Sequence, residues 1–286
     1  MNSDIVSTYF KSFNGTKLRV YNFGGTGPVL LLAHATGFNA RAYSKLASQL
    51  IDTFTVIGID AEGHGGSDVT PDGNKWSNYP QHIAHYLETQ SLRQVYGFGH
   101  SYGGAALLQL AAQHPNALEA LVAYEPVVFP GHPTTEPNFS SPITQLTLKR
   151  QFIFESREQA IANFESKPPM SYFSSGVVAD YVSGGTFINA NGLVELSCER
   201  SFEASIYAHA QMAGVEAMLP KIKGRVTYLY GEKSKDFSLD FFSEIEKKTP
   251  SSTLQSIESV GHFGPFEDPV RIGDIIRKSL TANGQH

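Results

Sequence analysis

The sequence Gly99-His100-Ser101-Tyr102-Gly103-Gly104 places a serine between two glycines that lie two residues to either side. It falls where a predicted strand ends and a predicted helix begins, which is the setting of a nucleophile elbow. The flanking glycines allow a sharp turn without Cβ clashes, so the Ser101 hydroxyl would stand at the tip of the turn. The backbone N–H of Tyr102 would then point toward an oxyanion formed there. The pattern predicts that Ser101 attacks a carbonyl carbon.

A serine hydroxyl becomes a useful nucleophile only when a base removes its proton. Among the ten histidines, His262 is the candidate base because it follows the last predicted strand. Catalytic groups of open α/β sheets gather at the carboxyl ends of strands. His100 lies beside Ser101 but on the other side of the turn, which indicates structural support. His82 and His85 share a predicted helix face, and without a third ligand a solvated face is favoured over a metal pair.

Strands and helices must bring these residues together. Strands are predicted at residues 29–33, 54–59, 95–98, 118–124, 226–230 and 253–257, and helices at residues 41–50, 79–92, 102–113, 239–247 and 269–281. This alternation favours a mostly parallel α/β sheet. Residues 7–13 and 17–23 flank Asn14-Gly15 and predict an antiparallel hairpin with a tight type I′ turn before the parallel strands begin.

Residues 126–220 break this alternation. They begin in a proline-rich stretch and show helical patterns near residues 143–154 and 157–166. Because unstructured loops longer than about 12–15 residues are uncommon, we expect an inserted helical cap that divides the core into residues 1–125 and 221–286. Two further βα units of the sheet are the alternative. Lys149 and Arg150 could meet an anionic substrate group, although a solvated helix face is the favoured interpretation.

Composition excludes several classes of protein. The 286 residues carry a formal net charge of −5, which argues against a nucleic-acid groove. The single cysteine excludes a disulfide scaffold and a thiolate metal cluster. No apolar stretch approaches the roughly 20 residues of a membrane helix, and no signal-peptide pattern opens the chain, so we expect a cytoplasmic protein. The glycine-rich residues 24–27 lack the Lys-Ser/Thr of a P-loop, so no nucleotide cofactor is implied.

Four motifs together resemble those of the α/β-hydrolase superfamily, in the family's order and with family-like spacing. They are His34-Ala35-Thr36-Gly37-Phe38, the turn from Asp60 to Ser67 with Glu62 in place of the usual arginine, the Ser101 elbow, and the loop from Gly261 to Pro265. The resemblance implies an α/β-hydrolase fold, with a mostly parallel eight-stranded sheet flanked by helices and an inserted helical cap. Residues of the cap are similar to a subgroup of bacterial hydrolases related to a fungal peroxisomal lipase and toxin-biosynthesis hydrolases.

The resemblance also implies an oxyanion hole. In the family a backbone N–H just after the His-Gly pair serves the oxyanion, and this position maps to Thr36, opposite the N–H of Tyr102. Ala35 stands where glycine is common in the family. Gly37 is therefore an alternative donor.

The family places the acid of the site at one of two positions. One follows the strand at residues 226–230, where this chain has Ser234 at the usual aspartate position and Asp236 two residues later. The other follows the strand at residues 118–124, where Glu125 stands 24 residues after Ser101. Glu125 is the favoured acid and Asp236 the alternative.

These features predict a serine hydrolase that cleaves carboxylic esters through an acyl-enzyme intermediate. The expected partner is a small-molecule ester, with no cofactor, metal, nucleic acid or membrane span, and the chain is expected to be a monomer or homodimer. The alternatives are a cofactor-free haloperoxidase or perhydrolase, a C–C bond hydrolase on the same triad, or a ligand-binding protein with weak catalytic activity.

Overall fold

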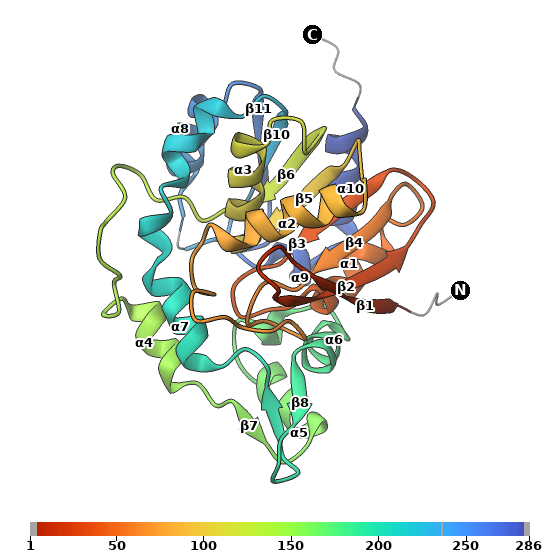
Figure 1. Cartoon of the computed structure of the whole chain (residues 1–286), viewed down its shortest axis with the longest axis vertical. Coiled ribbons are helices and arrows are strands. Elements are labelled where there is room, and N and C mark those ends of the chain that lie inside the picture. Colours follow the sequence, from red (N-terminus) through yellow and green to blue (C-terminus); the bar gives the residue numbers. More distant parts are fainter. Residues whose placement is uncertain (1–4, 236, 283–286) are drawn as a thin grey trace.

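Eight strands form the main sheet in the computed structural model, which describes residues 5–235 and 237–282 (Figure 1). In spatial order they are β1 (Val6–Lys11), β2 (Lys17–Gly24), β4 (Thr55–Ile59), β3 (Val29–Ala33), β5 (Tyr96–His100), β6 (Ala120–Tyr124), β10 (Arg225–Gly231) and β11 (Ser252–Ile257). β2 pairs antiparallel with β1 and with β4, and every other pair is parallel. The mostly parallel eight-stranded sheet expected from the sequence is confirmed.

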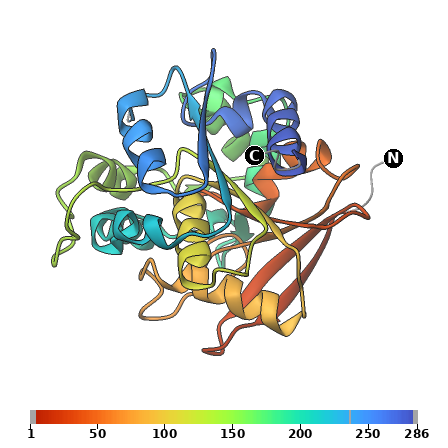
Figure 2. The ribbon, with the colours of Figure 1, turned by 90° about the horizontal axis from the view of Figure 1, so that it is seen from above.

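Helices cover both faces of this sheet (Figure 2). One face is covered by α2 (Asn78–Thr89), α3 (Tyr102–Gln113) and α8 (Leu239–Lys248), and the other by η1 (Ala40–Tyr43), α1 (Ser44–Ser48), α9 (Gly264–Glu267) and α10 (Pro269–Thr281). Alternate residues of β3 supply the two cores, because successive strand side chains point to opposite faces. Leu31 is buried with α2 and α3, whereas Leu30 and Leu32 are buried with α1 and α10.

Segment 126–220 leaves the sheet after β6 and returns to it at β10, and Figure 1 shows it in green and cyan below and to the left of the sheet. It contains α4 (Pro142–Lys149), β7 (Ile153–Phe154), α5 (Arg157–Glu165), η2 (Met170–Tyr172), α6 (Val177–Gly184), β8 (Thr186–Ile188), β9 (Val194–Leu196), α7 (Arg200–Ala208), η3 (Ala210–Ala213) and η4 (Val215–Lys221). β7, β9 and β8 form a small antiparallel sheet of their own. The segment is therefore mixed in structure rather than purely helical.

Two local predictions were wrong, and tertiary contacts explain both. The β1–β2 hairpin has a wider connection than a two-residue turn, because Ser12 is buried with its hydroxyl 2.7 Å from Nδ1 of His82 and its N–H donates to Thr16 O at 2.8 Å. The helix expected over residues 143–154 ends at Lys149, because Phe154 joins β7 and packs against Phe164 with ring centroids 5.4 Å apart.

Candidate active site

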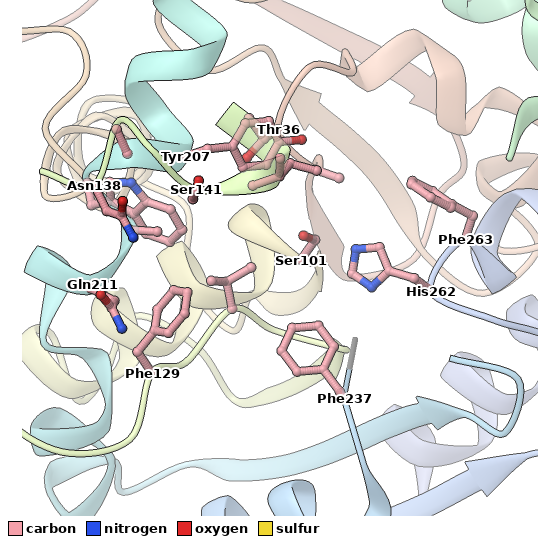
Figure 3. Close-up of a pocket in the computed structure, with 16 residues that line it drawn as sticks. Thr36, Ser101, Phe129, Asn138, Ser141, Tyr207, Gln211, Phe237, His262 and Phe263 are labelled. Carbon is pink, nitrogen blue, oxygen red and sulfur yellow. The ribbon is translucent and has the colours of Figure 1, made fainter. Parts of the chain in front are cut away.

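A pocket of about 460 Å³ lies between the loops that follow the parallel strands and segment 126–220. Ser101 and His262 both line it, and Figure 3 shows the Ser101 side chain next to the His262 ring. Thr36 lines another part of the same pocket. The structure thus brings together residues from three distant motifs at the carboxyl ends of the strands, where an open parallel sheet places its ligand sites.

Ser101 occupies the sharp turn between β5 and α3 that the sequence predicted. Its φ of +55° is unusual for a residue with a side chain, and its N–H is held by Tyr124 O at 2.9 Å. A Cβ on Gly103 would lie 2.1 Å from the carbonyl oxygen of Ala33, and one on Gly99 would lie 2.6 Å from Gly103 O. Only glycine fits at either position, so these two residues permit the turn that presents the Ser101 hydroxyl to the pocket.

His262 follows β11 and lies against a buried carboxylate. Its Nδ1 is 2.7 Å from Oε2 of Glu125, which directly follows β6 and is fully buried. The Glu125 carboxylate also accepts hydrogen bonds from Gly231 N–H at 2.8 Å and from the Ser234 hydroxyl at 2.9 Å. A proton held on Nδ1 leaves Nε2 of His262 free to accept one. Asp236, the alternative acid, lies outside the described residues.

Three further residues hold this arrangement, and of these the sequence analysis assigned a structural role to His100 but not to Ser234 or Tyr124. Ser234 stands where the family usually has its acid, and it instead donates to Glu125. The Tyr124 hydroxyl donates to Gly261 O at 2.6 Å, next to His262. His100 donates from Nε2 to His262 O at 2.8 Å and accepts at Nδ1 from a tyrosine hydroxyl, while burial lowers its pKa. The structural role predicted for His100 is therefore to fix the His262 backbone.

Two backbone N–H groups near Ser101 are free. Within residues 5–235 and 237–282, the N–H groups of Thr36 and Tyr102 have no hydrogen-bond partner in the protein, although both residues are buried. The N–H of Gly37, the alternative donor, is 3.0 Å from Nε2 of His64. Because buried N–H groups are nearly always paired, the two free ones mark a place for an acceptor atom of a ligand.

Two neutral histidines fix the loop that carries Thr36. His34 donates from Nδ1 to Ala35 O and accepts from Ala61 N–H at Nε2, both at 2.8 Å. His64 donates from Nδ1 to Glu62 O at 2.9 Å and accepts the Gly37 N–H at Nε2. Burial lowers the pKa of His34 to about 3 and that of His64 to about 4. Both rings therefore stay neutral at neutral pH and can act as acceptors.

We expect H64Q to weaken the pH dependence of stability. Below pH 6.5 the unfolded chain protonates His64 and the folded chain does not, so wild type loses stability as the pH falls toward about 4. H64Q lacks this titration, and its amide oxygen can still accept from Gly37. The difference in unfolding free energy between wild type and H64Q should therefore shrink by about 1 kcal/mol per pH unit between pH 6 and 4.5.

Urea unfolding at a series of pH values measures this difference. Other buried groups, such as Asp60, whose pKa burial raises to about 7, titrate in both proteins and cancel in the comparison. H132Q, at an exposed position, is the matched control and should follow wild type. Parallel curves for wild type and H64Q would contradict the prediction.

Two other charged clusters lie outside this pocket. Glu62 accepts from Thr70 N–H at 2.8 Å and lies 3.0 Å from Nε2 of His82, so both His82 nitrogens already have protein partners. Arg150 is half-buried and forms an ion pair with the buried Glu203, so the prediction of a solvated helix face was wrong for this residue.

In the described part of the chain, no group of three or more His, Cys, Asp or Glu side chains could hold a metal ion. No helix there is long and apolar enough to cross a bilayer.

Comparison with known proteins identifies the family of this chain. Residues 30–275 match the alpha/beta hydrolase family. The match covers well over half of the chain, so the protein belongs to this family, and its reaction class is hydrolysis.

Several relatives are similar over nearly the whole chain. An uncharacterized protein of Mycobacterium tuberculosis is 24% identical over 284 residues, which cover 95% of this chain and 80% of that protein. The structure of E-2-(acetamidomethylene)succinate hydrolase has a TM-score of 0.82 at 20% identity, covering 97% of this chain and all of the other. The structure of a peroxisomal alpha-beta-hydrolase of Saccharomyces cerevisiae has a TM-score of 0.76 at 16% identity, and the match covers 99% of this chain and 90% of the other. At these identities the structural matches establish the fold alone.

Proposed function

We propose that this protein is a serine hydrolase that cleaves carboxylic esters through an acyl-enzyme intermediate. The single observation that carries the proposal is the contact between His262 Nδ1 and the buried Glu125 carboxylate, in the pocket that Ser101 lines. A carboxylate on Nδ1 orients the imidazole and stabilises the imidazolium, which is the third member's task in a Ser-His-acid triad.

In this mechanism Ser101 Oγ attacks the acyl carbon while Nε2 of His262 takes its proton. Among the described residues no hydrogen bond joins these two groups, and such contacts commonly tighten only when substrate binds. The imidazolium then returns the proton to the departing alkoxide, which leaves as an alcohol. Water attacks the acyl-enzyme by the same route in reverse, with His262 again as the base.

The free N–H groups of Thr36 and Tyr102 support an oxyanion hole at these two positions. Negative charge develops on the carbonyl oxygen in each tetrahedral intermediate, and fixed donors stabilise it without reorganising. Loss of one such donor costs about 2.7–4 kcal/mol in comparable sites. The hydrogen bond from Gly37 to His64 favours Thr36 as the donor from its loop.

Segment 126–220 acts in this proposal as a cap, and residues 1–125 and 221–286 form the catalytic core. Support comes from the pocket lining, because residues of this segment, among them Asn138 and Tyr207, face the same space as Ser101 (Figure 3). The cap would therefore select the substrate, and the core would carry the chemistry.

A fluorophosphonate probe tests the proposed function directly. We expect wild type to take up one probe per chain, as measured by intact mass, and to lose labelling when p-nitrophenyl acetate competes. S141A is the matched control, because Ser141 lines the same pocket and its hydroxyl lies 2.6 Å from that of Thr144. Folded wild type that stays unlabelled would contradict the proposal. Peroxide-dependent bromination without ester cleavage would favour a haloperoxidase.

A further inference from the structure

We infer that the acyl group of the substrate is uncharged and largely apolar, and that an acyl group ending in a carboxylate is rejected. The inference rests on the proposed function and names the substrate class of the same site. It follows from the chemistry of the pocket wall, from the ion pair that Arg150 already forms, and from the polar groups across from His262.

The pocket wall carries no charged side chain among the described residues: none of its lining residues is Lys, Arg, Asp or Glu. Large apolar side chains make up much of it, including Val127, Phe129, Ile143, Phe237 and Phe263. A pocket of this kind gains free energy by removing apolar substrate surface from water. A carboxylate entering it would lose hydration without gaining a counter-charge.

Lys149 is exposed and lies outside the pocket lining, and Arg150, the other cation considered for an anionic substrate, is already paired. Its guanidinium pairs with the buried carboxylate of Glu203 and donates to Cys198 O at 3.2 Å. Recruiting it to a substrate would leave Glu203 as an uncompensated buried charge, which is strongly unfavourable. Within segment 126–220, the charges of Arg150 and Glu203 therefore offset one another.

Three uncharged polar side chains of the pocket lie across from His262. Figure 3 shows Asn138, Ser141 and Gln211 on the side of Ser101 that is remote from His262. Amides and hydroxyls can hydrogen-bond a neutral polar group, so a substrate that ends in an amide or hydroxyl remains acceptable. At about 30 Å³ per water-sized group, about 460 Å³ holds roughly 15 non-hydrogen atoms, which suits a medium-length acyl chain.

Three p-nitrophenyl esters of equal acyl-chain length test the effect of a charge at the end of the acyl chain. The hexanoate ends in a methyl group, the adipamate in a neutral amide, and the hydrogen adipate in a carboxylate of nearly the same shape as the amide. We expect kcat/KM at pH 7.5 to be highest for the hexanoate. It should be about 100-fold lower for the hydrogen adipate than for the adipamate, because only the carboxylate is desolvated as an ion.

A new cation in the pocket provides the second arm. Gln211 lines the pocket and is exposed, so Q211K adds a positive charge at little cost to folding, and Q211M is its uncharged control. The measured quantity is the ratio of kcat/KM for the hydrogen adipate to that for the adipamate within each protein. We expect this ratio to be at least about tenfold higher in Q211K than in Q211M, because both variants lack the Gln211 amide and only Q211K carries a charge.

The outcomes distinguish failure of the substrate class from failure of the proposed function. A protein that takes up the fluorophosphonate probe but cleaves the hydrogen adipate as well as the adipamate overturns the substrate class alone. An equal ratio in Q211K and Q211M also counts against it. A folded protein that neither labels nor cleaves any of the three esters overturns the proposed function and the substrate class with it.

Discussion

The variant S101A is expected to lower kcat for p-nitrophenyl hexanoate by about 10⁶ and to abolish fluorophosphonate labelling. Alanine keeps the Cβ, so the unusual φ of +55° is no more strained than in wild type. What the variant removes is the atom proposed to form the acyl-enzyme. The proposed oxyanion donors and the pocket remain, so a small rate above that of the uncatalysed reaction should persist with little change in KM.

Steady-state kinetics and intact mass measure this loss, and thermal unfolding verifies the fold. S141A again serves as the control, because it removes a second hydroxyl from the same pocket and should keep its ability to label. If S101A retained more than about one percent of the wild-type rate, attack by Ser101 would not be the chemistry of this pocket. The magnitude is large enough that trace contamination by another esterase must be excluded by titrating wild type with the probe.

Much of the fold could be predicted because the local signals agree with the tertiary structure. The boundaries predicted for α3 and α10 match those observed: α3 starts directly after the elbow, and α10 starts with Pro269 behind the Asp268 cap. The central strands are short apolar runs buried on both faces, as their composition indicated. The predictions of the hairpin turn and of the helix near residues 143–154 were wrong because Ser12 contacts His82 and Phe154 packs against Phe164, contacts that local sequence patterns do not include.

The approach of Ser101, His262 and Glu125 follows from their positions after β5, β11 and β6, whose carboxyl ends share one edge of the sheet. Finer contacts depend on side-chain geometry that no sequence pattern encodes. For example, Thr36 is favoured over Gly37 as the proposed oxyanion donor only because the Gly37 N–H is bonded to His64. The sequence did contain one indication that the acid lies elsewhere: Ser234 stands at the usual aspartate position of the turn after β10.

The variant E125Q is expected to lower kcat by about 10⁴, in line with amide substitutions of a triad acid. In wild type, Gly231 N–H donates to one carboxylate oxygen, and Ser234 and His262 Nδ1–H face the other. An amide has a single acceptor oxygen, so either orientation turns its NH2 group toward one of these donors. If the NH2 faces His262, the imidazole shifts its proton to Nε2 and can no longer accept one from Ser101.

Comparing E125Q with D236N tests which residue is the acid. D236N should stay within about threefold of wild type on p-nitrophenyl hexanoate, because Glu125 already supplies the carboxylate at Nδ1. A near-wild-type rate in E125Q together with a large loss in D236N would transfer the role to Asp236. Circular dichroism of both variants verifies that a lost rate is not a lost fold.

Ser234 allows the position of the acid to be exchanged. In wild type its hydroxyl lies 2.9 Å from Glu125 Oε2, which is also the oxygen that contacts His262. The double variant E125Q/S234D puts a carboxylate back into this space from the turn after β10, and we expect at least a tenfold recovery over E125Q. S234D alone crowds two carboxylates together, and their repulsion should displace Glu125 from Nδ1 of His262 and lower kcat. Recovery in the double variant with loss in the single one would show that the site requires one negative charge at Nδ1 of His262, whichever strand supplies it.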